Sequence, residues 1–267
     1  MAVTTPAILL RRIEFGEADL VVTLFTPDQG KISAVAKSAK KSVKRFPGVL
    51  ELFSRIEVVL SQGRGKGMPI LQEASLEEPF FRIRESMIKT AYASYWLEIV
   101  YLWMAENVPQ TELYHLINHV LARLNTGESP VEVLSLLFQM RFLGLSGFRP
   151  NLNQCHACKS ALDQIRSARV FSVPAKGGIA CPNCGGGVST DLAAISKGTL
   201  KQLAWMDANS VEQAARIRFT PAATSEGLAF LETFVPFHIG RSPKSLGVLR
   251  AVRAAMPSTP LNRNTGK

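Results

Sequence analysis

Residues 20–37 read LVVTLFTPDQGKISAVAK and join two runs of β-branched and apolar residues through a tight turn. The runs cover residues 20–26 and 31–37, and Pro27-Asp28-Gln29-Gly30 between them supplies residue types typical of turns. Three further runs of the same character lie in the first 75 residues, at 7–14, 53–60 and 68–74. With one long connection at residues 38–52, five short strands predict a small closed barrel of the oligonucleotide-binding (OB) type.

After Pro79 the spacing of apolar residues changes from two to about 3.6, which is the helical period. The clearest case is residues 112–124, where apolar residues form one stripe. The next helix is expected to start with Ser129 as its N-cap, Pro130 at the first helical position and Glu132 completing a capping box. Further helices are expected near residues 191–206 and 223–236.

All four cysteines lie within thirty residues, as two C-x2-C pairs separated by 22 residues: Cys155, Cys158, Cys181 and Cys184. Two such turns supply the four soft ligands that a tetrahedral Zn²⁺ prefers, so the spacing predicts one structural zinc ion. Two disulfides, redox-active pairs and His156 in place of one cysteine are the alternatives. Disulfides are disfavoured in the cytoplasm, where we expect the protein to reside because no signal sequence or membrane span is evident.

The expected fold class is therefore α+β, with an N-terminal five-stranded OB-fold β-barrel in residues 1–79. A mostly helical domain follows in residues 80–256 and contains a zinc-ribbon-like module with four cysteine ligands in residues 151–190. Residues 257–267 are expected to form a basic tail, and they are rich in the Pro, Ser and Thr typical of flexible ends.

Positive charge is concentrated at the two ends of the chain. The net formal charge of +10 divides into +5 for residues 1–72, −3 for residues 73–150 and +8 for residues 151–267. Such an excess favours an anionic partner, although a solvated surface that keeps the protein soluble explains it equally well in general.

The first concentration lies in the long connection of the barrel, and we expect it to bind a phosphate backbone. The candidate residues for contacts with nucleic acid are Lys31, Lys37, Lys40, Lys41, Lys44, Arg45, Arg64 and Lys66. Because Phe46 is the only aromatic residue inside the run, sequence-specific readout of bases is not expected. A possible second basic contact comprises Arg241, Lys244, Arg250 and Arg253.

Several sequence elements, taken in order, resemble the bacterial RecO family of recombination mediators over nearly the whole chain. They are Phe15-Gly16-Glu17-Ala18-Asp19, residues 23–31 (TLFTPDQGK), Val35-Ala36-Lys37, residues 138–150 (FQMRFLGLSGFRP) and residues 237–245 (FHIGRSPKS). The chain departs from the family at Ser38, where members often carry glycine.

The resemblance implies a protein without enzymatic activity that acts in recombinational DNA repair. It implies binding to single- and double-stranded DNA, strand annealing, and RecA loading onto DNA coated by the single-stranded-DNA-binding protein (SSB). The implied partners are RecR and the acidic SSB tail, with RecF as a further candidate and RecA as an indirect one. The implied location is the bacterial cytoplasm, at the nucleoid. Some family members lack the cysteines, so zinc is not required for the family's activity.

Two other classes of function remain open at this stage. One is a zinc-containing scaffold in transcription or translation whose barrel binds RNA. The other is an enzyme, which has the least support because the sequence shows no Ser-His-Asp arrangement, paired carboxylates or nucleotide-hydrolysis motif.

Overall fold

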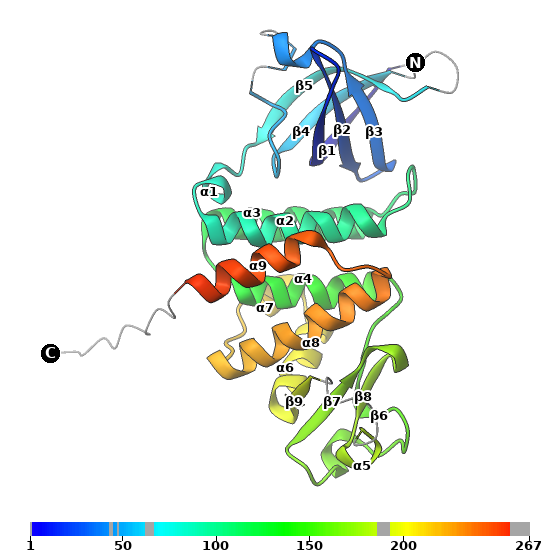
Figure 1. Cartoon of the computed structure of the whole chain (residues 1–267), viewed down its shortest axis with the longest axis vertical. Helices are drawn as coiled ribbons and strands as arrows, with labels where there is room; N and C mark the ends of the chain where they lie inside the picture. Colours follow the sequence, from blue (N-terminus) through cyan, green and yellow to red (C-terminus); the bar gives the residue numbers. More distant parts are fainter. Residues whose placement is uncertain (1, 43–44, 47, 62–66, 186–192, 257–267) are drawn as a thin grey trace, which may run out of the picture.

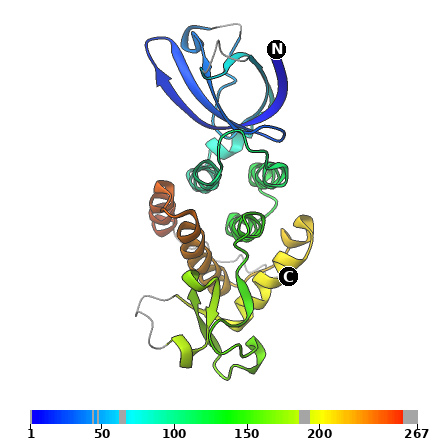
Figure 2. The same ribbon diagram turned by 90° about the vertical axis from the view of Figure 1, so that its right-hand side faces the viewer.

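The computed structural model describes residues 2–42, 45–46, 48–61, 67–185 and 193–256. It is elongated, with a β-barrel at one end, layers of helices in the middle and a small sheet at the other end (Figure 1). Figure 2 looks along the helices of the middle region, which lie between the barrel and the small sheet. The α+β fold class expected from the sequence is confirmed.

The barrel contains β1 (Ala2–Phe15), β2 (Asp19–Thr26), β3 (Gly30–Ala36), the 3₁₀ helix η1 (Ala39–Lys41), β4 (Arg55–Ser61) and β5 (Ile70–Glu78). The helical region contains α1 (Phe81–Arg84), α2 (Met87–Trp103), α3 (Thr111–Thr126), α4 (Val131–Leu145), α6 (Lys197–Ala208), α7 (Val211–Ala214), α8 (Pro221–Ile239) and α9 (Lys244–Ala255). The module between α4 and α6 contains β6 (Asn151–Cys155), η2 (Leu162–Gln164), β7 (Arg169–Val173), η3 (Pro174–Lys176), β8 (Gly178–Ala180), α5 (Pro182–Gly185) and β9 (Ala194–Ser196).

The five N-terminal strands close into a barrel in the order β1-β2-β3-β5-β4, as the alternating pattern predicted. β1 pairs antiparallel with both β2 and β4, and β3 meets β5 in parallel at Val35 and Ile70. Alternate residues point inward, so the barrel is filled by side chains that are at most 2% exposed: Val22, Leu24, Ile32, Ala34, Ile56 and Val58.

The barrel packs against α2 and α3 through a second set of apolar side chains. Ile8, Phe25 and Phe53 belong to the buried cluster of the helical region, and the ring of Phe25 meets that of Tyr114 edge-on with centroids 5.5 Å apart. The β2–β3 turn is also fixed, because the Asn107 N–H donates to the Lys31 carbonyl at 2.9 Å. Gly30 is required there, since a Cβ on it would clash with the Val108 carbonyl group.

Lys31 connects the barrel to the C-terminal end of α2. Its side chain is buried, and the Nζ donates to the Tyr101 carbonyl at 2.9 Å and lies 4.9 Å from the centroid of the Tyr101 ring. The carboxylate of Glu106 is 3.8 Å from the same nitrogen. The ammonium of Lys31 is therefore held inside the barrel–helix interface.

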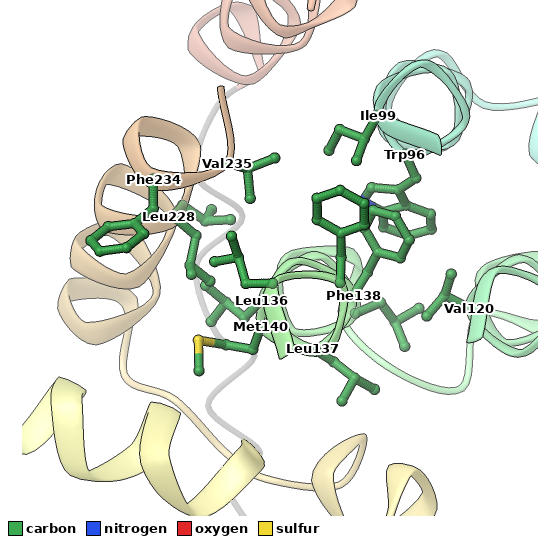
Figure 3. Close-up of a cluster of buried hydrophobic side chains, with 14 of the residues drawn as sticks. Trp96, Ile99, Val120, Leu136, Leu137, Phe138, Met140, Leu228, Phe234 and Val235 are labelled. Carbon is green, nitrogen blue, oxygen red and sulfur yellow. The ribbon is translucent and has the colours of Figure 1, made fainter. Parts of the chain in front are cut away.

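Helix α4 is the centre of the helical region, with α2, α3, α6 and α8 packed around it. Ten of its residues are buried, including the polar Ser135 and Gln139. Both polar residues have partners on α2, because Trp96 Nε1 donates to Ser135 Oγ at 3.2 Å and the Tyr95 hydroxyl donates to Gln139 Oε1 at 3.0 Å. Figure 3 shows apolar side chains from α2, α3, α4 and α8 converging here: Trp96, Ile99, Val120, Leu136, Leu137, Phe138, Met140, Leu228, Phe234 and Val235.

The predicted capping box at the start of α4 is wrong. The helix begins at Val131 with Pro130 as its N-cap, and no side chain caps it. Ser129 Oγ instead donates to the Ala215 carbonyl at 3.2 Å and accepts from Arg123 Nη2. A tertiary contact with the segment after α7 therefore replaces the local cap.

The basic segment after residue 238 contains helix α9, which the sequence pattern did not predict. Only Leu246 and Leu249 of this helix are buried. Two carboxylates of other helices hold it. Glu98 of α2 accepts hydrogen bonds from the backbone N–H groups of Lys244 and Ser245 at 3.0 and 2.8 Å, and Glu232 of α8 pairs with two arginines.

Among the described residues, no helix combines the length and the apolar character that crossing a membrane demands.

The turn after β3, which the sequence did not define, places Ser38 in the left-handed region with φ 54° and ψ 29°. Its N–H donates to the carboxylate of Asp19 at 2.7 Å, and this bond holds the backbone in place. A residue with a Cβ is strained in this region and glycine is not.

We expect Ser38→Gly to raise the free energy of unfolding by about 0.5–1 kcal/mol, because it removes that strain and keeps the bond from N–H to Asp19. Ala39→Gly is the matched control. Because Ala39 lies in the 3₁₀ helix with negative φ, this variant should lower the free energy of unfolding by about 0.5–1 kcal/mol. Urea unfolding of both variants measures the difference. A change of the same sign in the free energies of unfolding of both variants would contradict the assignment of backbone strain to Ser38.

Lys31→Met should lower the free energy of unfolding by about 1–2 kcal/mol, because the variant loses the bond to the Tyr101 carbonyl and the cation–π contact. Lys41→Met serves as control, since Lys41 is exposed and should change stability by no more than about 0.5 kcal/mol. Urea unfolding measures both values. Equal free energies of unfolding for the two variants would argue against a role for Lys31 in the interface.

Candidate metal centre and nucleic-acid interface

The module between α4 and α6 is a four-stranded sheet in the order β6-β8-β7-β9. Its strands have only three to five residues, so the sheet alone buries little apolar surface. Cys155 ends β6 and Cys158 lies in the turn that follows, whereas Cys181 follows β8 and Cys184 lies in α5. Two strand ends thus bring the two cysteine pairs to one place.

The four sulfur atoms form a compact group. All of them lie within 4.8 Å of one another, and the Sγ atoms of Cys158 and Cys181 are 3.8 Å apart. A regular tetrahedron with Zn–S bonds of about 2.3 Å has sulfur–sulfur distances of about 3.8 Å. A disulfide requires a separation of about 2.05 Å, and all four cysteines are free thiols here. The donor set therefore fits a single four-coordinate metal ion.

The surroundings favour thiolate at one pair of the group. Burial raises the pKa of Cys155, but backbone N–H groups of Cys181, Cys158 and Ala157 more than offset this effect, so the pKa is lowered overall. Hydrogen bonds from the side chain and backbone of Ser160 lower the pKa of Cys158 to about 6. Thiolate is the metal-binding form of cysteine.

In the other pair, the neighbouring sulfur atoms shift the pKa of Cys184 in the opposite direction. Hydrogen bonding with the sulfur of Cys181, and then with that of Cys158, raises the pKa of Cys184. Four thiolates at this separation repel one another. A bound divalent cation removes that repulsion, which is the electrostatic reason why this arrangement suits a metal.

Close packing ties the metal-ligand group to the rest of the protein. A Cβ on Gly178 would lie 2.7 Å from the Asn151 carbonyl oxygen, so only glycine lets β8 approach β6 closely. Cys155 and Cys181 belong to the same buried cluster as the side chains around α4. Two of the four ligands are therefore part of the helical core, whereas Cys184 is half-buried and Cys158 is exposed.

The predicted DNA-binding residues of the barrel separate into three groups. Lys37, Lys40, Lys41 and Arg45 are exposed on or beside the connection at residues 38–52. Lys31 lies apart from them in the barrel–helix interface. Lys44, Arg64 and Lys66 lie outside the described residues, as does the expected tail at residues 257–267.

The exposed cations of this loop differ in their partners. Lys40 Nζ lies 2.7 Å from Glu14 Oε2, and this contact lowers the pKa of Glu14. The guanidinium of Arg45 donates to the Lys37 carbonyl at 2.6 Å and lies 5.2 Å from the centroid of the Phe46 ring. Within the described part of the chain Lys37 and Lys41 form no ion pair, so their charges face solvent.

The four cations proposed for a second basic contact do not form one free surface. Arg250 and Arg253 bind the buried carboxylate of Glu232, with closest distances of 3.1 and 2.7 Å. Arg241 and Lys244 are exposed at the start of α9, where Arg241 donates to the Leu102 carbonyl at 3.3 Å. Arg250 and Arg253 thus anchor a helix, although the side chain of Arg250 is still 53% exposed, and Arg241 and Lys244 lie at the surface.

The sequence did not identify the carboxylates that pair with these cations. Glu14 and Glu232 lie far in sequence from the cations they bind, and no local spacing connects them. The only sequence signal is the lack of acidic residues after residue 238, which means that any carboxylate neutralising α9 must lie elsewhere in the chain.

Comparisons with known proteins place both parts of the chain in one family. The family model described as Recombination protein O N terminal matches residues 1–80, and that described as Recombination protein O C terminal matches residues 84–247. The DNA repair protein RecO of Desulfosudis oleivorans is 42% identical over 94% of this chain and 98% of that protein. The proteins of the same name from Desulfatibacillum aliphaticivorans and Syntrophus aciditrophicus are 40% and 31% identical, over 94% and 93% of this chain and 97% and 95% of their own lengths.

We expect metal-free protein to bind one Zn²⁺ per chain and to gain about 4 kcal/mol in free energy of unfolding at a free zinc concentration a thousandfold above the dissociation constant. Urea unfolding with and without zinc measures the gain. Cys158→Ser should abolish it, because the variant lacks one thiolate. Identical unfolding curves of the original protein in both conditions would contradict a metal site.

Proposed function

The chain belongs to the RecO family of DNA repair and recombination proteins, and we propose that it is a DNA-binding recombination mediator. In this proposal it anneals complementary strands and, together with RecR, promotes RecA loading onto single-stranded DNA coated by SSB. The observation that supports DNA binding most directly is the pair of exposed lysines without ion pairs in the described part of the chain, Lys37 and Lys41, on an OB-type barrel.

Electrostatics supplies a mechanism that needs no active site. Two DNA strands repel each other through their phosphates, and cations that contact both backbones reduce this repulsion and release counterions. Lys37, Lys41 and the neighbouring Lys40 and Arg45 are proposed to contact one strand. Since lysine contacts phosphates and leaves base edges free, the bound strand can still pair with its complement.

The remaining roles are assigned by the same reasoning. The four cysteines are proposed to hold one structural zinc ion, because four protein thiolates leave no open position for catalysis. Arg241 and Lys244 are proposed as a second contact for DNA or for the acidic tail of SSB. RecF is proposed as a further partner, and the protein is proposed to act at the bacterial nucleoid.

Strand annealing tests the proposed activity. With two complementary oligonucleotides that carry a donor and an acceptor fluorophore, we expect the protein to accelerate annealing at low salt and to lose this effect as salt increases. No acceleration at low salt would contradict the proposal. Binding of a peptide with the sequence of an SSB tail, compared with its charge-neutralised version, tests the second contact.

Replacing Lys37 and Lys41 together by Glu should weaken single-stranded DNA binding roughly tenfold or more, whatever the DNA sequence. The slope of log K against log salt should become less negative by about 1.4, because two phosphate contacts are lost. Fluorescence anisotropy at several salt concentrations measures both quantities.

The control is Arg166→Glu with Lys176→Glu, which changes the net charge equally on the exposed surface of the cysteine module. This double variant should keep the original slope. If both double variants weaken binding to the same extent, the effect comes from net charge and the barrel loop is not the contact.

A further inference from the structure

Strand β5 has one free edge, which comprises residues 72–78. The strand pairs with β4 along its whole length, but on its other side it meets β3 only at Ile70, opposite Val35. Among the described residues, no backbone hydrogen bond connects residues 72–78 to any segment except β4. The barrel is therefore closed at the start of β5, and the outward N–H and C=O groups of the free edge are available to another strand.

The free edge is accessible to solvent. Leu71 is the last buried residue of the strand, and residues 75–78 are all exposed. Leu76 lies directly opposite Ile56, so the two side chains share the inward face of the sheet. Ile56 is fully buried, yet Leu76 is 45% exposed, because no strand covers it on the side of the free edge.

The inward face of the free edge is apolar. From Glu73 to Leu76 the pairing with β4 is regular, and the register shifts only on either side of this stretch. Ala74 lies opposite the buried Val58, so Ala74 and Leu76 both face inward. An added strand would continue this face with apolar side chains at every second position.

The outward face carries negative charge. Glu73 of β5 and Glu57 of β4 are exposed and form no ion pair within the described chain. Glu77 and Glu78 share one cation, since Arg55 lies 2.8 Å from the first carboxylate and 3.9 Å from the second. Four carboxylates and one guanidinium give this part of a basic protein a net charge of −3.

This charge decides between the possible occupants of the free edge. DNA is repelled, because its phosphates would approach the unpaired carboxylates. A second copy of the chain would place the same carboxylates next to each other, and like charges on neighbouring strands destabilise a sheet. A strand with cations on one face and apolar side chains on the other matches both faces of β5.

We propose that the free edge of β5 binds an extended segment of a partner protein in which lysine or arginine alternates with apolar residues. The segment adds a strand to the barrel through backbone hydrogen bonds. Its apolar side chains lie beside Ala74 and Leu76, and its cations lie beside Glu57 and Glu73. This contact goes beyond DNA binding, because the ligand is a protein and the charges that select it are carboxylates.

The first test uses a fluorescein-labelled octapeptide in which lysine alternates with valine, at about 0.15 M salt. A peptide of the same composition with all lysines before all valines is the control. The alternating peptide should bind roughly fivefold more tightly, because only this order places valines on one face and lysines on the other. Fluorescence anisotropy measures both affinities, and equal affinities or no binding would overturn the proposal.

Hydrogen–deuterium exchange locates the peptide on the unaltered protein. Binding should slow amide exchange in residues 72–78, because their outward N–H groups become hydrogen-bonded. Exchange in the β1–β2 hairpin should not change. Binding that leaves exchange in residues 72–78 unchanged would show attraction by charge alone and would overturn the added strand.

Charge reversal tests the role of the carboxylates. Glu57→Lys with Glu73→Lys should weaken binding of the alternating peptide roughly tenfold. Glu17→Lys with Glu212→Lys is the matched control, since it changes the net charge equally at two exposed residues and should alter the affinity by less than about twofold. Equal weakening by both double variants would overturn the assignment to β5. No DNA is present in these experiments, so their outcome does not depend on the proposed annealing activity.

Discussion

The burial of helix α4 on all sides is the constraint on which the rest of the structure depends. Its apolar side chains extend toward α2 and α3 on one side and toward α6 and α8 on the other. Residues 133–140 of this helix are all buried, so the polar Ser135 and Gln139 must find partners, and Trp96 and Tyr95 provide them. The barrel packs on α2 and α3, α9 packs on α2, and the cysteine module packs on α6 and α8, so all three are placed through helices that surround α4.

The cations of the chain have two different roles. Some hold elements of the fold together and others leave positive charge at the surface, and their interaction partners distinguish the two groups. Lys31 and Arg253 lie in or beside the core, with Tyr101 and Glu232 as partners, and they hold elements together. Lys37 and Lys41 form no ion pair within the described residues and contribute positive potential to the surface. A net charge of +10 therefore overstates how much charge is available to a ligand.

Local patterns were sufficient to predict the barrel, the stripe of α3 and the gathering of four cysteines, because each depends on neighbours in sequence or on short spacings. The prediction failed where a residue far away in sequence determines the local structure. Ser129 has every feature of an N-cap, yet the Ala215 carbonyl binds its hydroxyl. Helix α9 has only two buried apolar residues, and it is held by Glu98 and Glu232, which lie on other helices. Lys31 is part of a basic sequence, but the fold places it against α2.

The barrel and the cysteine module lie at opposite ends of an elongated molecule, and continuous side-chain packing joins them (Figure 1). The helical layers between them therefore separate the two ends. A ligand on the barrel and a ligand on the module would therefore lie at separate ends of the molecule. The length of the helical region sets the minimum distance between them.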